Sequence, residues 1–390
     1  MTSLPRPKRI LVLHLAGQYP LGGIGWQAVH YVIGLARLGH DVYYVEDSAA
    51  TPYDPRVSSL VGDCAYGVEF LRRTMERFGL GGRWAYKDMV HDQCYGLERE
   101  RLDRLYREAD ALVNVCGTTR LREEHMACPI RIYVQTDPVF EQIRVAENHA
   151  ETLELLAAHT HHFTYGENLG QPDCPIPLQK FDWRPTRPPV VLDLWEPDFD
   201  PAADRFSTVG TWENVNKDVR FDGQTYHWSK HVNFLRVLDL PRLTSQPLEL
   251  ALETVDGRTR ALLLARGWHL ADAYEKSRDT DTYRRHIYDS RGEFTVAKDL
   301  VARTRCGWFS DRSVCYLAAG KPVVTQETGF SMYVPTGRGL FAFHTAEEAA
   351  AALEEINRDY ALHCRAAREV AVGSFDSDKV LGELCREAGL

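Results

Sequence analysis

The sequence predicts an α/β protein built from two doubly wound domains. Apolar, buried-type strands alternate with amphipathic helices along most of the chain, which is the pattern of parallel sheets covered by helices. The chain has 390 residues, which is long for a single hydrophobic core. A proline-rich stretch, residues 171–204, interrupts this alternation near the middle of the chain and reads as a semi-rigid crossing.

The composition is that of a soluble globular protein, with 44% hydrophobic and 26% charged residues. The net charge of −9 argues against general affinity for nucleic acids or membranes, and no apolar run reaches the ~18 residues of a membrane span. The start, MTSLPRPKRI, lacks a secretory apolar segment, and nine dispersed cysteines without a C-x-x-C pair fit free thiols in a reducing compartment. We therefore expect a cytoplasmic monomer or homodimer, with no metal site and no nucleic-acid polymer among its partners.

The first half opens with a βαβ pattern. Residues 9–14 read as a buried parallel-type strand, residues 26–38 as an amphipathic helix and residues 41–46 as a second strand. Such units wind right-handed into parallel sheets. The glycines before the helix, Gly22 and Gly23 among them, lack the G-x-G-x-x-G spacing, so NAD binding has little support. They serve either as a tight turn or as a place where the backbone approaches a ligand.

Further elements precede the proline-rich stretch. Residues 68–78 and 97–108 are predicted helices, and residues 111–116, 131–135 and 162–165 are predicted strands. Each strand ends in a polar loop, and ligands of open parallel sheets lie outside the carboxyl ends of the strands. Side chains from these loops are expected on one rim together with His14 and Gly23: Thr118, Asp137, Gln142, Glu167 and Asn168.

Two of these residues are candidate general bases for an acceptor hydroxyl. Asp137 follows a buried strand and precedes Pro138, so it either faces a cleft as a base or caps a helix. His14 ends the first strand and is the alternative base, or else a histidine satisfied within the core. His161 and His162 do not read as a metal pair, because neighbouring strand residues point to opposite faces.

The second half repeats the strand–helix alternation. Residues 190–195 form either a strand or an extended linker, and residues 279–281, Asp-Thr-Asp, read as a solvated loop. The other expected elements are, in order, a strand at 206–210, a hairpin at 223–228, a helix from 229, strands at 248–253 and 261–265, and helices at 294–304, 346–360 and 376–388.

The most informative stretch is residues 305–330, RCGWFSDRSVCYLAAGKPVVTQETGF, which reads as strand, turn, short helix, strand and turn. Ser310, Asp311 and Ser313 are expected to cap the helix, whose first N–H groups lack partners within it. A helix N-terminus carries a partial positive charge that suits a phosphate, and Arg312 adds a cation to it.

The end of this stretch supplies a second loop on the same edge. Gly320 ends the helix, residues 321–325 form a short buried strand, and the loop that follows contains Glu327, Thr328 and Gly329. Two adjacent loops at strand ends, one of them cationic, make a cradle for phosphate and sugar. The alternative is a plain structural turn of an α/β protein.

These residues resemble the donor-binding part of GT-B glycosyltransferases of the family 1 and family 4 type. In those proteins a loop, a helix ending in A-x-G-x-P-V-V and a second glycine loop hold a nucleotide sugar, and residues 320–324, G-K-P-V-V, match that core. The chain departs from the pattern at Cys315, where many relatives have a ribose-binding Glu, so Asp311 or Glu327 would replace it. The resemblance implies a GT-B fold, with two Rossmann-like domains that face an interdomain cleft.

The resemblance also implies a division of the chain. Residues 1–190 would form the acceptor-side domain and residues 191–365 the domain that binds the nucleotide sugar. Residues 366–390 would form a C-terminal helix that crosses back to the first domain.

The implied activity is a metal-independent glycosyl transfer of the hexosyltransferase type. A UDP-, GDP- or dTDP-sugar would donate the sugar to a hydroxyl or similar nucleophile of an unknown acceptor, with no permanently bound cofactor. The implied donor-binding residues are Gly210, Thr211, Lys230, Ser310, Asp311, Arg312, Ser313, Glu327, Thr328 and Gly329. The implied acceptor-side residues are Gly22, Gly23, Gln142, Glu167 and Asn168, with Asp137 or His14 as the catalytic group.

Lys230 has its place in this scheme by order along the chain. Retaining GT-B enzymes have a cation early in the second domain, after a strand ending in Gly, which neutralises the donor diphosphate. Lys230 is similar in order, His231 or Lys217 would be substitutes, and the alternative is a solvated surface lysine.

Two other functions remain open at this stage. A non-hydrolysing sugar-nucleotide epimerase shares the architecture and would need further acid–base carboxylates in the cleft. A catalytically silent nucleotide-binding protein would keep the fold, and Cys315 in place of Glu favours it mildly. The sequence has no P-loop, no G-x-S-x-G and no H-E-x-x-H motif.

Overall fold

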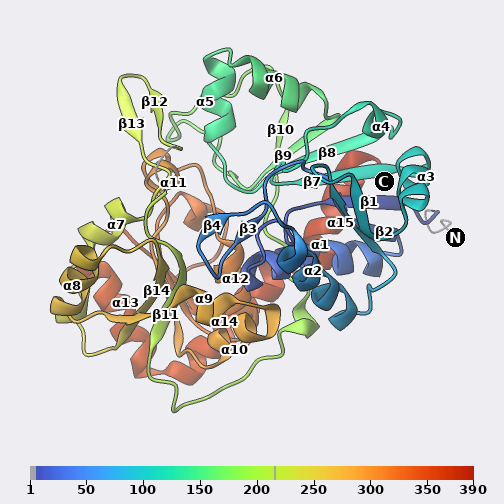
Figure 1. The fold of residues 1–390 in the computed structure, drawn as a ribbon. Coiled ribbons are helices and arrows are strands. Elements are labelled where there is room, and N and C mark those ends of the chain that lie inside the picture. Colours follow the sequence, from blue (N-terminus) through green and yellow to red (C-terminus); the bar gives the residue numbers. More distant parts are fainter. Residues whose placement is uncertain (1–5, 215–216) are drawn as a thin grey trace, which may run out of the picture.

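Two β-sheets, each with helices packed on it, organise the chain (Figure 1). They are seen in a computed structural model, which describes residues 6–214 and 217–390. The first five residues of the N-terminal stretch considered above therefore lie outside the described part. The doubly wound α/β fold predicted from the sequence is confirmed, because all neighbouring strands of both large sheets except one pair run parallel.

The first sheet has the strand order β10-β9-β8-β7-β1-β2-β5-β6. Its strands are β1 (Arg9–Leu13), β2 (Asp41–Glu46), β5 (Trp84–Asp88), β6 (Gln93–Gly96), β7 (Ala111–Val115), β8 (Ile130–Gln135), β9 (His161–Thr164) and β10 (Trp183–Pro185). From β1 the chain winds outward through β2, and from β7 it winds outward in the opposite direction. The strand order thus reverses between β1 and β7, which is where ligands of such sheets bind.

The second sheet has the order β15-β14-β11-β16-β17-β18, and its order reverses between β11 and β16. Its strands are β11 (Phe206–Thr211), β14 (Leu248–Glu253), β15 (His269–Ala271), β16 (Gly292–Thr295), β17 (Val323–Gln326) and β18 (Leu340–Phe343). Two small antiparallel pairs lie outside the large sheets, β3 (Tyr53–Asp54) with β4 (Ser59–Leu60) and β12 (Val219–Phe221) with β13 (Gln224–Tyr226).

Helices connect these strands. Those of the first half are α1 (Gly22–Arg37), α2 (Ala65–Arg77), α3 (Arg99–Glu108), α4 (Glu123–Met126), α5 (Phe140–Ala146) and α6 (Ala150–Ala157). Those of the second half are α7 (His231–Arg236), α8 (Gly257–Ala265), α9 (Ala273–Ser277), α10 (Thr280–Tyr288), α11 (Asp299–Thr304), α12 (Asp311–Ala318), α13 (Ala346–Arg358), α14 (Tyr360–Ser374) and α15 (Ser377–Ala388), with 3-10 turns η1 (Leu192–Leu194), η2 (Leu240–Arg242) and η3 (Phe330–Met332). No helix of the described part combines the length and the apolar character that crossing a membrane requires.

Two apolar cores join the lobes. One combines Trp26 of α1 with Trp195 of the crossing segment and with residues of α10, α12 and α14. The other packs Ile143 of α5 and Leu169 against Tyr226 of the β12–β13 hairpin and Leu300 of α11. The last helix, α15, contributes to the core of the first lobe, and a β-carbon on Gly34 of α1 would lie 2.5 Å from Leu381.

Three sequence predictions of local structure are wrong. The strand expected at the start of residues 305–330 does not form, because residues 306–310 have no regular secondary structure. Residues 22–25 are not a loop but the first turn of α1, and Gly22 is needed there because its β-carbon would lie 2.3 Å from the carbonyl oxygen of Asp279. Residues 261–265 are not a strand but the end of α8, which starts where the Asp256 carboxylate accepts the N–H groups of Arg258 and Thr259.

Other elements differ in their bounds or were not expected. The Asp-Thr-Asp sequence begins α10, because Asp279 accepts the N–H of Thr282, so it is a helix start rather than a solvated loop. Within residues 190–195, Val190 forms an isolated β-bridge with Asp376, and Leu192–Leu194 form the 3-10 turn η1. The antiparallel pair β5–β6 extends the first sheet in a stretch where the sequence pattern is irregular.

Candidate active site

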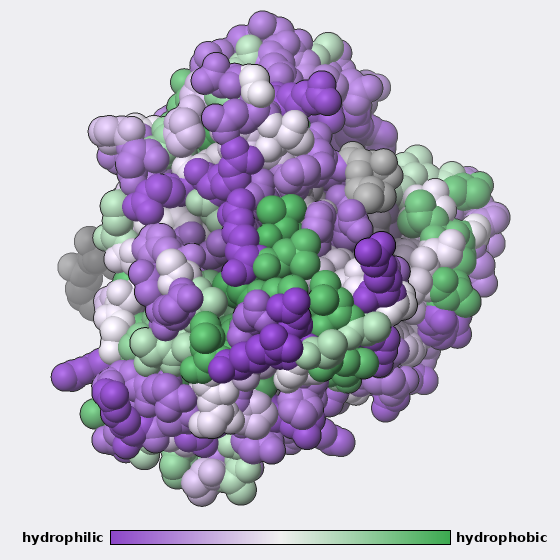
Figure 2. All heavy atoms as spheres, turned by 90° about the vertical axis from the view of Figure 1, so that its left-hand side faces the viewer, coloured by the Kyte–Doolittle hydropathy of each residue, from purple (hydrophilic) through white to green (hydrophobic). Residues whose placement is uncertain are grey.

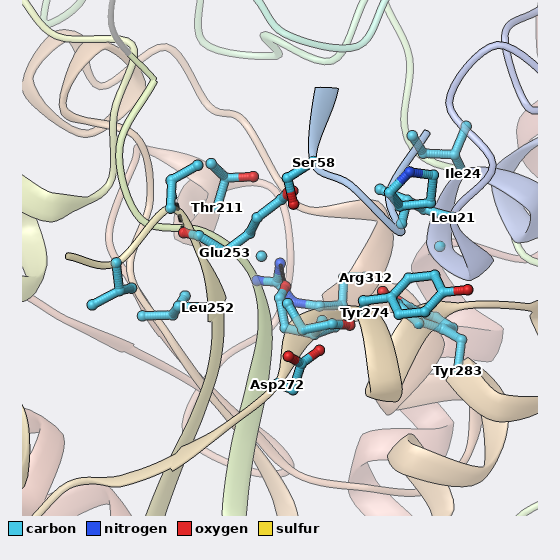
Figure 3. Close-up of a pocket in the computed structure, with 18 of the residues that line it drawn as sticks. Leu21, Ile24, Ser58, Thr211, Leu252, Glu253, Asp272, Tyr274, Tyr283 and Arg312 are labelled. Carbon is cyan, nitrogen blue, oxygen red and sulfur yellow. Dashed lines mark hydrogen bonds between the residues drawn. The ribbon is translucent and has the colours of Figure 1, made fainter. Parts of the chain in front are cut away.

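A cavity of about 550 Å³ lies between the two lobes (Figure 3). The first lobe contributes the start of α1 and the β3–β4 arm, which we define as residues 48–64. The second lobe contributes the carboxyl ends of β11, β14 and β15 and the start of α12. Residues from both lobes that line it include Leu21, Gly23, Gln27, Arg56, Thr211, Glu253, Asp272, Tyr274, Asp311 and Arg312.

Arg312 lies at the switch point of the second sheet. Its Nε donates to Glu293 of β16 at 2.5 Å, Nη1 to the carbonyl oxygen of Val209 on β11 at 2.9 Å, and Nη2 to the hydroxyl of Thr295 at 2.8 Å. Burial works against its charge, but the Glu293 carboxylate outweighs burial and raises the pKa of Arg312. A guanidinium has five N–H donors, so two remain for a ligand in the cavity.

Lys230 lies beside Arg312. A β-carbon placed on Gly210 would be 3.7 Å from Arg312 Nη1 and 3.9 Å from Lys230 Nζ, so the two cations flank this glycine. Burial and the neighbouring Arg312 charge lower the pKa of Lys230 well below its ordinary value. Within the described part of the chain, the Lys230 ammonium makes no hydrogen bond or ion pair with a side chain. The charges of Glu293 and Asp137 act on the pKa of Lys230 in the opposite sense to Arg312, but burial and Arg312 outweigh them.

The start of α12 is less capped than the sequence suggests. Ser310 is the N-cap residue, but its side chain accepts no N–H of the first turn. The hydroxyl of Ser313 is buried and has no partner among the described residues. The N-cap side chain therefore leaves the first N–H groups of α12 uncapped, and Ser310 and Asp311 line the cavity.

The second loop of the predicted cradle does not line this cavity. Glu327 accepts the N–H of Gly329, and the Thr328 hydroxyl donates to the carbonyl oxygen of Trp308. Gly329 has φ +95°, and a β-carbon there would lie 2.6 Å from the carbonyl oxygen of Arg305. The loop thus folds back on the segment that precedes α12. Cys315 is buried as well, with its sulfur 3.9 Å from His30 Nε2.

The two candidate bases occupy different environments. His14 is completely buried, its Nε2 donates to Gln27 at 2.8 Å, and burial lowers its pKa to about 4. It therefore reaches the cavity only through Gln27. Asp137 is partly exposed and forms a 2.6 Å ion pair with Lys298 of the opposite lobe. Asp137 lies at the interface of the lobes, but its carboxylate already has a cationic partner.

The other residues expected on the acceptor-side rim lie away from the cavity. Gln142 is buried and accepts the N–H of Val139, and it exchanges amide hydrogen bonds with Gln135. Glu167 pairs with Arg187 at 2.9 Å. Asn168 donates to the carbonyl oxygen of Arg305 at 2.7 Å.

Asn168 is used to hold the lobes together, whereas the side-chain contacts of Gln142, Glu167 and Thr118 lie within the first lobe. A β-carbon on Gly307 of the second lobe would lie 2.5 Å from the backbone nitrogen of Asn168. The Thr118 hydroxyl is 3.5 Å from Asn114 within its own loop. Of the two glycines expected here, Gly23 lines the cavity, whereas Gly22 packs against α10.

Sequence reasoning missed the β3–β4 arm. Its Tyr53 hydroxyl donates to Glu253 of the second lobe, and the hydroxyl of Tyr66, just after it, lies 3.1 Å from that of Tyr274. Arg56 of the arm is held by Asp54, lines the cavity and lies over the Tyr66 ring. The Tyr53–Glu253 and Tyr66–Tyr274 contacts join residues about 200 positions apart, so no local pattern could have predicted them.

Glu46 fixes the loop between β1 and α1. It accepts the N–H groups of Gly17 and Gln18 and the hydroxyl of Tyr44. Burial raises the pKa of Glu46 from 4.5 to about 7, although these three hydrogen bonds oppose the shift. A buried carboxyl that titrates near neutrality therefore supports the loop that leads to Gly23.

This pKa predicts a pH dependence of stability. The folded protein holds the Glu46 proton more tightly than the unfolded chain does. Protonated Glu46 therefore adds to the free energy of unfolding. This addition is largest below pH 4.5 and is lost as the pH rises through about 7. The loss amounts to about 3 kcal/mol, since one pKa unit corresponds to about 1.4 kcal/mol. Denaturant unfolding of the wild type and Glu46→Gln from pH 5 to 8 should show a flatter curve for the variant. Parallel curves would contradict the assignment.

One group of potential metal ligands lies outside the cavity. Among the described residues, Asp47, Glu124 and His125 bring their ligand atoms within 4.8 Å of one another. Arg122 and Lys87 already approach Asp47 to 2.5 and 3.6 Å. Two cations thus compensate the buried Asp47 carboxylate, and the group reads as a structural ion-pair network.

One face of the molecule is largely polar. Figure 2, which shows the side that faces left in Figure 1, has hydrophilic atoms over most of this face and apolar atoms gathered near its centre. The predominance of hydrophilic atoms agrees with the charged content of 26%.

No protein-family model matches the chain, and no curated protein sequence matches it. Solved structures do match. An alpha-glucosyltransferase in complex with UDP and a 13-mer DNA has a TM-score of 0.57 at 11% identity and covers 98% of this chain and 100% of its own. HepE of Anabaena in complex with UDP-glucose has a TM-score of 0.56 at 12% identity, with 98% and 99% covered.

A third match is sucrose-phosphate synthase from Thermosynechococcus elongatus, with a TM-score of 0.54 at 12% identity and 97% and 98% covered. All three similarities extend over both lobes. The chain therefore has the GT-B fold of glycosyltransferases, as its resemblance over residues 305–330 implied.

Proposed function

We propose that the protein is a glycosyltransferase that moves a sugar from a nucleotide-diphosphate sugar to an acceptor hydroxyl or similar nucleophile. The observation that carries this proposal is the pair Arg312 and Lys230, which flank Gly210 at the switch point of a GT-B fold. The leaving nucleoside diphosphate gains negative charge in the transition state, and cations already in place stabilise that charge without rearrangement. We further propose hexosyl transfer without a metal ion.

The site residues divide by lobe in this proposal. Arg312, Lys230 and the free N–H groups at Ser310 and Ser313 hold the diphosphate, and Gly210 and Thr211 allow it to approach the sheet. Gly23 belongs to the acceptor side. The loop at Thr328 supports the donor site from behind, because it anchors the segment before α12.

The lowered pKa of Lys230 adds a specific expectation. Burial and the Arg312 charge make its amine hold a proton weakly, and the negative charge of a diphosphate bound beside Gly210 would oppose both effects and raise the pKa. Diphosphate binding should therefore be coupled to proton uptake. UDP is the first nucleotide to test because HepE and the alpha-glucosyltransferase were solved with UDP or UDP-glucose.

The proposal is tested by isothermal titration calorimetry with UDP, GDP, dTDP and ADP. We expect one nucleoside diphosphate to bind, with a heat that varies with the ionisation enthalpy of the buffer because a proton is taken up. Binding of none of the four would reject a nucleotide-sugar enzyme. If a diphosphate binds but no sugar donor and acceptor give a product, the protein is a catalytically silent nucleotide-binding protein. The presence of Cys315 where many relatives have Glu also favours that alternative.

The proposed cell location is the cytoplasm. All nine cysteines lie in the described part of the chain and none forms a disulfide, and seven of them are buried. A monomer or homodimer remains the expected assembly, which size-exclusion chromatography with light scattering checks directly.

A further inference from the structure

The proposed donor site leaves Asp311 without a role. It is the first residue of α12, it lines the cavity, and it neighbours Arg312. A carboxylate at this point repels a diphosphate, so an anion-binding site has no use for it in the ionised form. The sequence resemblance also offered Asp311 as a ribose ligand, but a carboxylate that binds ribose does not need contacts with the opposite lobe.

The side chain of Asp311 is contacted by the opposite lobe. The hydroxyl of Tyr165, after β9, donates to Oδ1 at 3.4 Å, and Tyr165 is 2.8 Å from the hydroxyl of Tyr31 on α1. Gln27, also on α1, interacts with the carboxyl group and connects it to His14. Asp311 therefore reaches across the interface to the acceptor-side lobe, although it belongs to the donor-side lobe.

These surroundings hold the pKa of Asp311 at about 7. Burial is the main cause, the Gln27 side chain opposes it, and the nearby Asp137 charge raises the pKa further. The titratable and charged groups that face it come from every adjoining element: Tyr31, Cys116, Asp137, Tyr165, Arg312 and Cys315. Since the thiols and phenols have raised pKa values, they stay neutral at pH 7.

The other carboxyl groups at the cavity are engaged. Glu253 accepts the Tyr53 hydroxyl, and Asp272 accepts the N–H of Glu275 as the N-cap of α9. Asp137, which does not line the cavity, pairs with Lys298 at 2.6 Å. Asp311 also accepts hydrogen bonds, from Tyr165 and Gln27, but among the described cavity-lining carboxyl groups it is the one next to Arg312 at the start of α12, where the leaving diphosphate is proposed to lie. A general base must be within reach of the acceptor hydroxyl at the reacting centre, and this position meets that condition.

We infer that Asp311 is a catalytic residue that takes the proton of the acceptor hydroxyl, in the role that the sequence gave to Asp137 or His14. The inference rests on the proposed transfer reaction. The acceptor oxygen forms a bond to the anomeric carbon, and its proton moves to an Asp311 carboxylate oxygen. The bond from the anomeric carbon to the phosphate oxygen breaks, and its electron pair leaves with the nucleoside diphosphate beside Arg312 and Lys230. Asp311 then returns the proton to water.

The test uses Asp311→Asn and Asp137→Asn in the full-length protein. Calorimetry with the nucleoside diphosphate that binds the wild type measures donor affinity. Release of that diphosphate from UDP-glucose, or from the GDP- or dTDP-sugar that matches it, measures turnover with water as the acceptor. Asp256→Asn is the matched control, because Asp256 also lies at a helix N-terminus but is exposed and outside the cavity.

We expect Asp311→Asn to reduce turnover by about 100-fold or more, the range for losing a general base. Its diphosphate affinity should be unchanged or higher, since a repelling carboxyl group is removed. Wild-type turnover should rise with pH around 7. Because Glu46 also titrates near 7 in both proteins, the readout is the infrared difference between them: the wild type should show one more protonated-carboxyl group titrating there than Asp311→Asn. Asp256→Asn should behave as the wild type.

Three outcomes would overturn the inference. Loss of diphosphate affinity together with turnover in Asp311→Asn would make it a donor-binding residue. Unchanged turnover in Asp311→Asn with a large loss in Asp137→Asn would return the role to Asp137. Identical carboxyl titrations near pH 7 in the wild type and Asp311→Asn would remove the proton acceptor. If the wild type binds no diphosphate at all, the transferase proposal itself fails and the inference fails with it.

Discussion

Arg312→Ala is expected to weaken diphosphate binding roughly 10- to 100-fold and to destabilise the protein. The guanidinium has two N–H groups free for a ligand, and hydrogen bonds to charged groups contribute about 1.5–3 kcal/mol, so affinity should fall roughly 10- to 100-fold. The same change leaves Glu293, which is completely buried, without its cation. Removing one partner of a buried ion pair costs about 3–5 kcal/mol of stability. Calorimetry and denaturant unfolding measure the two effects separately.

A second variant separates these effects. Arg312→Met combined with Glu293→Gln removes both charges, so the buried-charge penalty disappears and most of the stability should return. Diphosphate binding should stay as weak as in Arg312→Ala, because the cation is still missing. Recovery of binding in the double variant would show that Arg312 acts on the fold and not on the ligand, and the proposed donor site would then be wrong.

Much of the fold could be predicted from the sequence, because buried parallel strands are continuous apolar runs bounded by turn residues. The runs at residues 9–13 and 111–115 show this clearly. The runs at 22–25 and 261–265 misled for opposite reasons. Glycines normally signal loops, but Gly22 is required inside a helix by its contact with α10. An apolar Leu-Leu-Leu run normally signals a strand, but in α8 one of these side chains, Leu264, is 52% exposed.

The candidate site was only partly predictable for a related reason. The residues at the start of α12 follow one local pattern, so Asp311 and Arg312 could be placed at the cavity from sequence. The pairing of Asp137 with Lys298, and of Tyr53 with Glu253, joins residues from different lobes. Such pairings depend on how the two lobes are oriented, and the spacing of residues along the sequence does not reveal that orientation.

The orientation of the lobes depends strongly on Trp26, and Trp26→Ala is expected to cost about 3–5 kcal/mol of unfolding free energy. The ring is 1% exposed, lies 4.6 Å from the Trp195 ring, and donates its Nε1 hydrogen to the carbonyl oxygen of Thr280 at 2.8 Å. It thus connects α1 of the first lobe with the crossing segment and α10 of the second. Its loss should weaken the coupling between lobes and divide one denaturant transition into two.

Trp268→Ala is the matched control for this prediction. Trp268 is 2% exposed and donates its Nε1 hydrogen to the carbonyl oxygen of Leu238 at 2.9 Å, but it packs within the core of the second lobe alone. Both variants lose a buried indole and one hydrogen bond, so the stability costs should be similar. Only Trp26→Ala should separate the transitions and reduce diphosphate affinity, because the cavity is formed by both lobes. If the two variants unfold alike in a single transition, Trp26 is an ordinary core residue, and the lobes are held in place by the contacts around α5 and the β12–β13 hairpin instead.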